Sequence, residues 1–151
     1  MMKSIYLIGS LRNIQIPVIA NQLEDEGFEV FDSWYSPGPN ADTHWKEYEI
    51  TRGRTYVEAL RHHAAQHIFE FDKFHIDRCD MGVMVLPAGR SGFLELGYII
   101  GSGKPGYILL DNGEQDRWDV MLQFATAVCE TMDELVAEIR KPRDFSTSRL
   151  T

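Results

Sequence analysis

Short apolar runs recur along the chain and are separated by stretches with helical spacing. The runs are rich in β-branched and aromatic residues, which favour extended backbone. They predict strands at Ser4–Ile8, Phe28–Asp32, Met81–Leu86, Gly106–Leu110 and Ala127–Glu130. Continuous runs of this kind are typical of strands that are buried on both faces of a parallel sheet.

Between these runs, apolar residues are spaced as on one face of a helix. The segment Ile14–Glu26 has this pattern, with Pro17 in its first turn and Gly27 placed to end it. Thr131–Glu134 has the form of a capping box and predicts a last helix that ends near Arg140. The predicted helices therefore alternate with the predicted strands along the chain, and the last helix follows the last strand.

The longest helical stretch runs from about residue 44 to residue 79, with a break expected near Asp72 or Phe74. One face of it is expected to pack on the core and carries Tyr56, Ala59, Leu60, Ala64, His67, Ile68 and Phe71. The segment 33–43 before it contains Pro37–Asn40 and reads as a loop. Trp34 and Tyr35 in this loop suggest that it can close over a ligand.

Two further segments follow the fourth predicted strand. Asp111–Gly113 reads as a loop, and Trp118–Phe124 reads as a short helix. Strands that alternate with helices predict an α/β fold: a five-stranded, mainly parallel, doubly wound sheet of the Rossmann or flavodoxin type, with helices on both faces. We expect one domain over residues 1–142, followed by a polar tail at 143–151.

We expect the strands Ser4–Ile8 and Met81–Leu86 to lie at the centre of the sheet. The turns at Gly9 and Pro87 then fall at the point where the strand order reverses. Ligands of open α/β sheets bind at this point, outside the carboxyl ends of the strands.

Composition narrows the possible partners. A net charge of −8 argues against binding to a nucleic-acid polymer, because such binding depends on neutralising phosphates. The first residues contain too short an apolar run for a signal peptide or a membrane span, so we expect a cytoplasmic protein with no membrane contact. Cys79 and Cys129 are too few for a disulfide framework and are expected to be reduced.

Glu95 is a carboxylate in an otherwise apolar helix start. It follows the tight turn Pro87–Gly92, and we expect it in the first helical turn, where the helix dipole favours an ionised carboxylate by about 0.3–1 kcal/mol. Gly97 and Gly101 on the same helix are expected to form a stripe that lets it approach the sheet. A charged carboxylate at the mouth of a parallel sheet is a candidate nucleophile.

Five segments in this order resemble the nucleoside 2-deoxyribosyltransferase family, which includes related deoxynucleotide N-glycoside hydrolases. They are Ile5–Ser10, Asp72 in the long helical stretch, Glu95-Leu96-Gly97, Gly103-Lys104-Pro105 and Trp118–Met121. The resemblance covers most of the chain. It implies the same doubly wound fold and an enzyme that acts on 2′-deoxyribonucleosides without a metal or organic cofactor.

The resemblance also implies roles for single residues. Glu95 becomes the nucleophile that attacks the anomeric carbon, Tyr6 the residue that orients it, and Asp72 the group that handles the proton of the nucleobase. Asp119 and Met121 fall where a neighbouring subunit of a homo-oligomer contributes contacts to the 5′-hydroxyl of the sugar. The turns at the switch point add candidate substrate contacts at Gly9, Ser10, Gly89, Ser91 and Gly92.

The expected reaction is transfer of deoxyribose from one nucleobase to another through a covalent ester on Glu95, by two displacements with retention. Gly89 stands where these transferases usually carry an acidic residue that holds the base, so the preferred base stays open. Asp119 suits a 5′-hydroxyl and repels a 5′-phosphate.

Two other functions fit the same residues. In a nucleoside or nucleotide N-glycoside hydrolase, water accepts the sugar, and Arg90 and Ser91 at the helix start can hold a 5′-phosphate. In a nucleotide-binding sensor, Glu95 only hydrogen-bonds a ribose.

A metal site and a set of phosphate ligands are both disfavoured. His63 and His67 alone are too few ligands for a metal site. Arg52 and Arg54 are expected to be exposed helix charges and not phosphate ligands.

Overall fold

The computed structural model describes residues 2–110 and 117–143. Its sheet contains β1 (Ser4–Ile8), β2 (Glu29–Phe31), β3 (Met81–Val85), β4 (Gly106–Leu109) and β5 (Ala127–Cys129). The strands are all parallel and stand in the order β2-β1-β3-β4-β5. The predicted strands are confirmed to within two residues at each end. The predicted loop at Asp111–Gly113 and all but Arg143 of the predicted tail lie outside the described residues.

β1 lies between β2 and β3. After β1 the chain adds β2 on one side of it, and β3, β4 and β5 are then added on the other side. Tyr6 in the middle of β1 pairs with Phe31 of β2 and with Gly82 of β3. The strand order therefore reverses between β1 and β3, as predicted. The turns after Ile8 and after Val85 meet at the carboxyl end of this pair.

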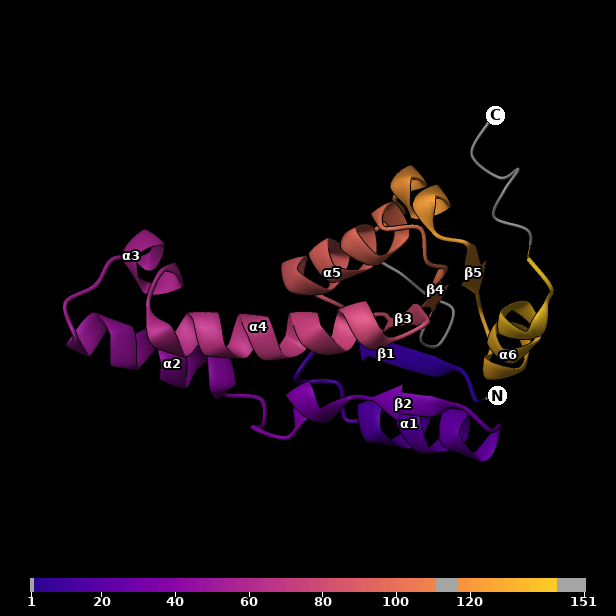
Figure 1. Cartoon of the computed structure of the whole chain (residues 1–151), viewed down its shortest axis with the longest axis horizontal. Helices are drawn as coiled ribbons and strands as arrows, with labels where there is room; N and C mark the ends of the chain where they lie inside the picture. Colours follow the sequence, from indigo (N-terminus) through magenta and orange to yellow (C-terminus); the bar gives the residue numbers. More distant parts are fainter. Residues whose placement is uncertain (1, 111–116, 144–151) are drawn as a thin grey trace.

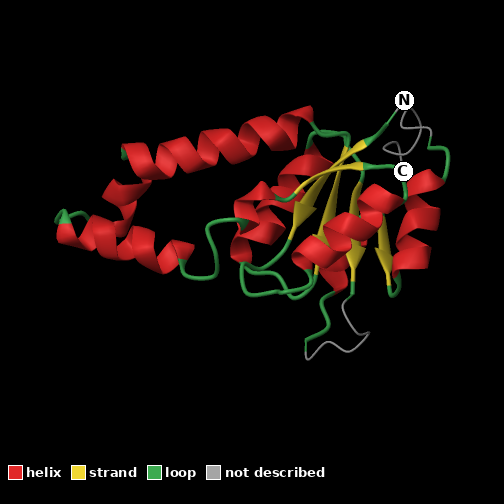
Figure 2. Cartoon of the chain, turned by 90° about the horizontal axis from the view of Figure 1, so that it is seen from below, coloured by secondary structure: helices red, strands yellow, loops and turns green. Residues whose placement is uncertain are grey.

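Helices cover both faces of the sheet (Figure 2). Ile5 and Leu7 of β1 face one core, formed with α1 (Ile16–Asp25) and α6 (Met132–Arg140). Tyr6 and Ile8 face the other, which includes residues of α4 (His63–Arg78) and α5 (Arg90–Gly101). Alternating side chains of β1 therefore point into two different cores, and only one of these contains Tyr6. The predicted doubly wound α/β fold is confirmed.

α5 approaches the sheet through glycines on the strands. A Cβ on Gly82 would lie 2.7 Å from Cδ1 of Ile99, and one on Gly106 would lie 2.7 Å from Cγ1 of Ile100. Around Gly97 and Gly101, by contrast, a Cβ would meet no atom within 4 Å. The expected glycine stripe on α5 is therefore wrong, because these two glycines do not face the sheet.

The long helical stretch forms three helices: α2 (Ala41–Thr51), α3 (Tyr56–Leu60) and α4. The expected break near Asp72 or Phe74 is wrong, since α4 runs through both. The chain turns earlier, where Gly53 has a φ of +77° and Thr55 opens α3 with a capping box. Figure 1 shows that α2, α3 and the first half of α4 project away from the sheet as an arm, defined here as residues 41–70.

The apolar face predicted for this stretch is only partly buried. Ala59 is buried, but large apolar side chains of the arm and the residues after it are exposed in this chain. They are Tyr48, Ile50, Tyr56, Val57, Leu60, Ile68, Phe69, Phe71 and Phe74. The predicted single face is wrong, because Tyr56–Leu60 lie in α3 and residues 64–71 lie in α4, and most of its large side chains are exposed.

Two short 3₁₀ helices complete the described chain. Trp34 in η1 (Ser33–Tyr35) donates from Nε1 to the carbonyl oxygen of Leu7 at 2.7 Å and packs against both cores, so it anchors its segment to the end of β1. The predicted helix at Trp118–Phe124 is η2 (Val120–Phe124). No helix among the described residues is long and apolar enough to cross a membrane.

Candidate active site

Tyr6, Asp72 and Glu95 come together on the face of the sheet that is covered by α4 and α5. Tyr6 lies in β1, Asp72 in α4 and Glu95 in α5. The Tyr6 hydroxyl donates a hydrogen bond to the Glu95 carboxylate, and Asp72 lies near enough for its charge to act on both. Three residues that are far apart in the sequence thus form one cluster.

Glu95 lies in the second turn of its helix, not in the first. α5 begins at Arg90, and Gly89 is its N-cap. Burial raises the pKa of Glu95 from 4.5 to about 7, the Tyr6 hydrogen bond lowers it, and the charge of Asp72 raises it further. The expectation of a carboxylate in the first turn, held ionised by the helix dipole, is therefore wrong, because Glu95 lies one turn further along and burial raises its pKa.

Tyr6 is a fixed hydrogen-bond donor. Its side chain is buried, and burial together with the charges of Glu95 and Asp72 raises its pKa far above the ordinary value. Its ring stacks on Phe31 with 5.3 Å between centroids, and Phe31 stacks on His75 at 3.9 Å. Sequence reasoning missed this stack. The available signal was that His75 follows Asp72 by three residues and so shares its helix face.

Asp72 is half-buried, and this burial raises its pKa. Two carboxyl groups in one partly dry site resist double ionisation, since like charges repel more strongly where water is excluded. Such a pair keeps one proton over part of the neutral range. The site can therefore offer one acid and one base at the same time.

A further carboxylate at the same edge of the sheet was not predicted. Asp32 directly follows β2, next to the end of β1, and its half-burial raises its pKa. It is also the N-cap residue of η1 but makes no capping hydrogen bond with its side chain. Its position as the last residue of a predicted strand was the signal that could have pointed to it.

The residues of the two turns that were predicted to contact the substrate lie at this edge of the sheet, and they differ in how tightly they are packed. Gly9 and Gly92 pack tightly: a Cβ would lie 2.5 Å from Cδ1 of Ile16 at Gly9 and 3.1 Å from Cγ2 of Ile8 at Gly92. The close packing explains both glycines without a ligand. Ser10 accepts a hydrogen bond through Oγ from the backbone nitrogen of Arg12 at 3.1 Å.

Gly89 and Ser91 lie at the start of α5 and are exposed. No side chain caps this helix, so its first backbone N–H groups are available to an anion.

Asp119 is the N-cap residue of η2, Met121 lies within η2, and the two residues interact locally. The Asp119 Oδ1 accepts from the Met121 backbone nitrogen at 2.9 Å, and its Oδ2 lies 3.9 Å from Nη2 of Arg117. Met121 is 62% exposed, and the neighbouring Trp118 is 91% exposed. Within residues 2–110 and 117–143, no hydrogen bond or ion pair links them to the cluster around Glu95.

Arg54 lies in the arm and not at this site. Its Nη1 forms an ion pair of 2.9 Å with Oε2 of Glu49, and its side chain is only 17% exposed. The expectation of an exposed helix charge is wrong, because Arg54 lies in the turn between α2 and α3.

Neither a metal cluster nor a disulfide is found in the described part of the chain. No group of three or more His, Cys, Asp or Glu residues in it could hold a metal ion. Cys79 and Cys129 are buried and free.

No protein-family description matches this sequence, and no curated protein matches it. Among solved structures, a 2-deoxyribosyltransferase from Bacillus psychrosaccharolyticus is similar, with a TM-score of 0.57 and 19% identity over 87% of this chain and 89% of that one. A conserved protein from Enterococcus faecalis has a TM-score of 0.60 and 13% identity over 92% of this chain and 98% of that one.

A CMP N-glycosidase from Clostridium botulinum has a TM-score of 0.49 and 15% identity, over 91% of this chain and 98% of that one. The likeness to the deoxyribosyltransferase shows that this chain shares its fold, which the sequence motifs had implied.

Proposed function

We propose that this chain is an N-glycosyl enzyme that cleaves 2′-deoxyribonucleosides and transfers the sugar to another nucleobase. The observation that carries the proposal is the cluster of Tyr6, Asp72 and Glu95 at the switch point of the sheet, with the pKa of Glu95 at about 7. A nucleophile and an acid are the two groups that this reaction needs.

In the first displacement, a Glu95 carboxylate oxygen bonds to C1′ while the bond from C1′ to the base nitrogen breaks. The electron pair of that bond leaves with the base, which takes a proton from Asp72. A second base then attacks C1′, releases Glu95 and returns a proton to Asp72. Two inversions give net retention.

The proton shared by the two carboxyl groups must lie on Asp72 when the reaction begins. In the free protein, burial and then the charge of Asp72 raise the pKa of Glu95 to about 7, so Glu95 itself holds a proton over part of the neutral range. Positive charge develops on the sugar in the transition state and favours an ionised Glu95 beside it. Tyr6 supports this form because its hydroxyl donates to the carboxylate.

A nucleoside 5′-monophosphate N-glycoside hydrolase is the second candidate. The start of α5 favours it, since Gly89, the N-cap of this helix, forms no side-chain cap and the exposed Arg90 and Ser91 follow it. A 5′-phosphate fits backbone N–H groups and an arginine in this arrangement. Water then takes the place of the second base.

Chromatography of one reaction mixture distinguishes these functions. The protein is incubated with a deoxynucleoside or its 5′-monophosphate, with and without a free acceptor base. A new deoxynucleoside that forms only with the acceptor identifies a transferase, whereas free sugar without it identifies a hydrolase. If neither product forms with any of the natural bases, the proposal of an enzyme is wrong and the sensor becomes the better reading.

We also infer that a second copy of the chain completes the site through Asp119 and Met121. The support is the resemblance to the family together with the exposed Trp118, Met121 and Phe124, which leave an apolar surface on η2. Light scattering with activity measured on the same fractions tests this inference. A monomer that is fully active contradicts it.

A further inference from the structure

The arm contains a pocket that shares no lining residue with the cluster around Glu95. It has a volume of about 380 Å³ and lies between the end of α2, the turn after it and the start of α4. Its lining consists of Tyr48, Glu49, Arg52, Arg54, His62, His63 and Ala64. His63 precedes Asp72 by nine residues on one continuous helix, which places them roughly 13 Å apart along its axis. The pocket is large enough for a small metabolite.

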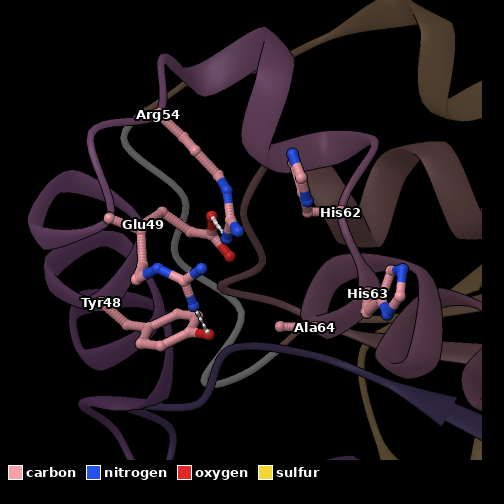
Figure 3. A pocket seen from close by; sticks show the side chains of 7 residues that line it. Tyr48, Glu49, Arg54, His62, His63 and Ala64 are labelled. Carbon is pink, nitrogen blue, oxygen red and sulfur yellow. Dashed lines mark hydrogen bonds and ion pairs between the residues drawn. The ribbon is translucent and has the colours of Figure 1, made fainter.

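Two arginines and two histidines line this pocket. Arg52 and Arg54 line it from the turn after α2, and His62 and His63 line it from the start of α4 (Figure 3). Arg52 is held by a hydrogen bond of 3.1 Å from its Nη1 to the hydroxyl of Tyr48. Two guanidinium groups outweigh the one carboxylate that lines the pocket, so an anionic ligand is favoured.

The start of α4 adds backbone donors to the same wall. His62 is its N-cap but makes no capping hydrogen bond with its side chain, and Ala64 in the first turn lines the pocket. α4 is 16 residues long, so the first N–H groups and the dipole of a full helix are directed at an incoming anion.

Glu49 supplies a hydrogen-bond acceptor to a pocket that is otherwise lined mainly by donors. It is 2% exposed, and its Oε2 accepts from Nη1 of Arg54 at 2.9 Å. Its Oε1 is buried and has no hydrogen-bond partner among the described residues. Figure 3 shows the carboxylate turned toward the space between Arg54 and His62. A buried acceptor left unpaired destabilises the fold, and a donor on a ligand removes that cost.

We propose that this pocket binds a sugar phosphate, with the phosphate at Arg52, His62 and the start of α4 and a sugar hydroxyl donating to Glu49. A phosphate alone leaves Glu49 without a donor, and a neutral sugar leaves the cationic wall without an acceptor. A phosphate monoester of a polyhydroxylated molecule satisfies both walls.

Nuclear magnetic resonance of the histidine ring signals tests the site directly, with His62 and His63 assigned from His62→Gln and His63→Gln variants. Ribose 5-phosphate, ribose and inorganic phosphate are titrated separately into the full chain. We expect ribose 5-phosphate to shift both signals with saturation below 1 mM and at least tenfold more tightly than inorganic phosphate, and ribose to leave them unmoved. No saturable shift with ribose 5-phosphate overturns the proposal, and equal binding of inorganic phosphate overturns the part played by the sugar.

Two variants make the test specific. Arg52→Ala removes a cation that is not the ion-pair partner of Glu49, and we expect it to weaken binding at least tenfold. Arg61→Ala removes an arginine of the same arm that does not line the pocket, and binding should be unchanged. Equal loss in both variants contradicts the assigned site.

The Glu95→Gln variant separates this site from the proposed reaction. It should retain the shifts of His62 and His63 while losing glycosidic cleavage. Loss of the shifts in this variant would place the binding at the active site instead.

Discussion

The hydroxyl of Tyr6 in β1 donates to the carboxylate of Glu95 in α5 and lowers a pKa that burial has raised to about 7. Burial and the hydrogen bond thus have opposite effects on the pKa of the same carboxyl group. Burial makes Glu95 a stronger base and a better nucleophile once it is ionised, and the tyrosine keeps the ionised form accessible near neutral pH. This balance leads to predictions on stability, pH dependence and catalysis.

The stability of the protein should respond to Glu95 in a pH-dependent way. In the unfolded chain its pKa is near 4.5 and in the folded chain about 7, so the folded state binds the proton more tightly and loses stability as pH rises between these values. Glu95→Gln removes this loss and should raise the free energy of unfolding by up to about 3 kcal/mol at pH 8, with little change at pH 5. Urea denaturation at both pH values measures it.

Glu47→Gln, on the exposed side of α2, is the control for that measurement. We expect it to change the free energy of unfolding by less than about 0.5 kcal/mol at either pH. The same gain for Glu95→Gln at pH 5 and pH 8 would show that Glu95 does not titrate between them. Glycosidic cleavage should be lost in Glu95→Gln, and more than a few per cent of the original activity would exclude Glu95 as nucleophile.

Activity should depend on pH as a bell, because the reacting pair needs one proton shared between Glu95 and Asp72. The alkaline limb of kcat/KM should fall with an apparent pKa near 7. Tyr6→Phe removes the hydrogen bond that lowers the pKa of Glu95, so this limb should move to higher pH by about one unit or more. A limb that stays in place in Tyr6→Phe would contradict the assigned role of the tyrosine.

Asp72→Asn should lower the rate of glycosidic cleavage most for substrates whose base must be protonated before it can leave. General-acid catalysis contributes about 10² to 10⁴ in rate, so natural deoxynucleosides should lose about that factor. Deoxyribosides with an activated leaving group should lose much less, and steady-state kinetics on both substrate types makes the comparison. Equal losses on both would assign Asp72 a structural role only.

Asp119 should set the preference at the 5′ position, if the partner subunit presents it there. A carboxylate about 4 Å from a dianionic phosphate is repelled by several kcal/mol at an effective dielectric of 20. Deoxynucleosides should therefore be turned over with higher kcat/KM than their 5′-monophosphates, and Asp119→Asn should narrow the difference. A preference of the original protein for monophosphates would favour the hydrolase and place Arg90 at the phosphate.

Two glycines of α5 should respond to alanine in opposite directions. A Cβ on Gly92 would lie 3.1 Å from Ile8 and 3.2 Å from Ala88, so Gly92→Ala should destabilise the protein by about 1–3 kcal/mol. Gly97 has open space around it, and Gly97→Ala should stabilise the helix by about 0.5–1 kcal/mol. Thermal unfolding of both variants measures the contrast, and a stabilised Gly92→Ala would contradict the packing.

The sequence by itself determined the elements and their order. Strand periodicity is local, so Ile5 and Leu7 against Tyr6 and Ile8 could be read as two faces before any fold was known. The alternation of strands and helices, with the rule of right-handed crossovers, left few sheet orders open, and the observed order is among them. Motif order likewise pointed to Glu95, Tyr6 and Asp72.

Only the tertiary structure decided what depends on distance through space. The depth at which α5 packs buries Glu95 and raises its pKa, which no residue spacing reveals. The arm leaves the sheet with α2, and the chain reverses beyond the turn at Gly53, so large apolar side chains of the arm stay exposed (Figure 1). The ion pair of Glu49 and Arg54, which converts two surface charges into one wall of a pocket, exists only because that turn brings them together. Burial and charge pairing act across space, and sequence patterns record only neighbours along the chain.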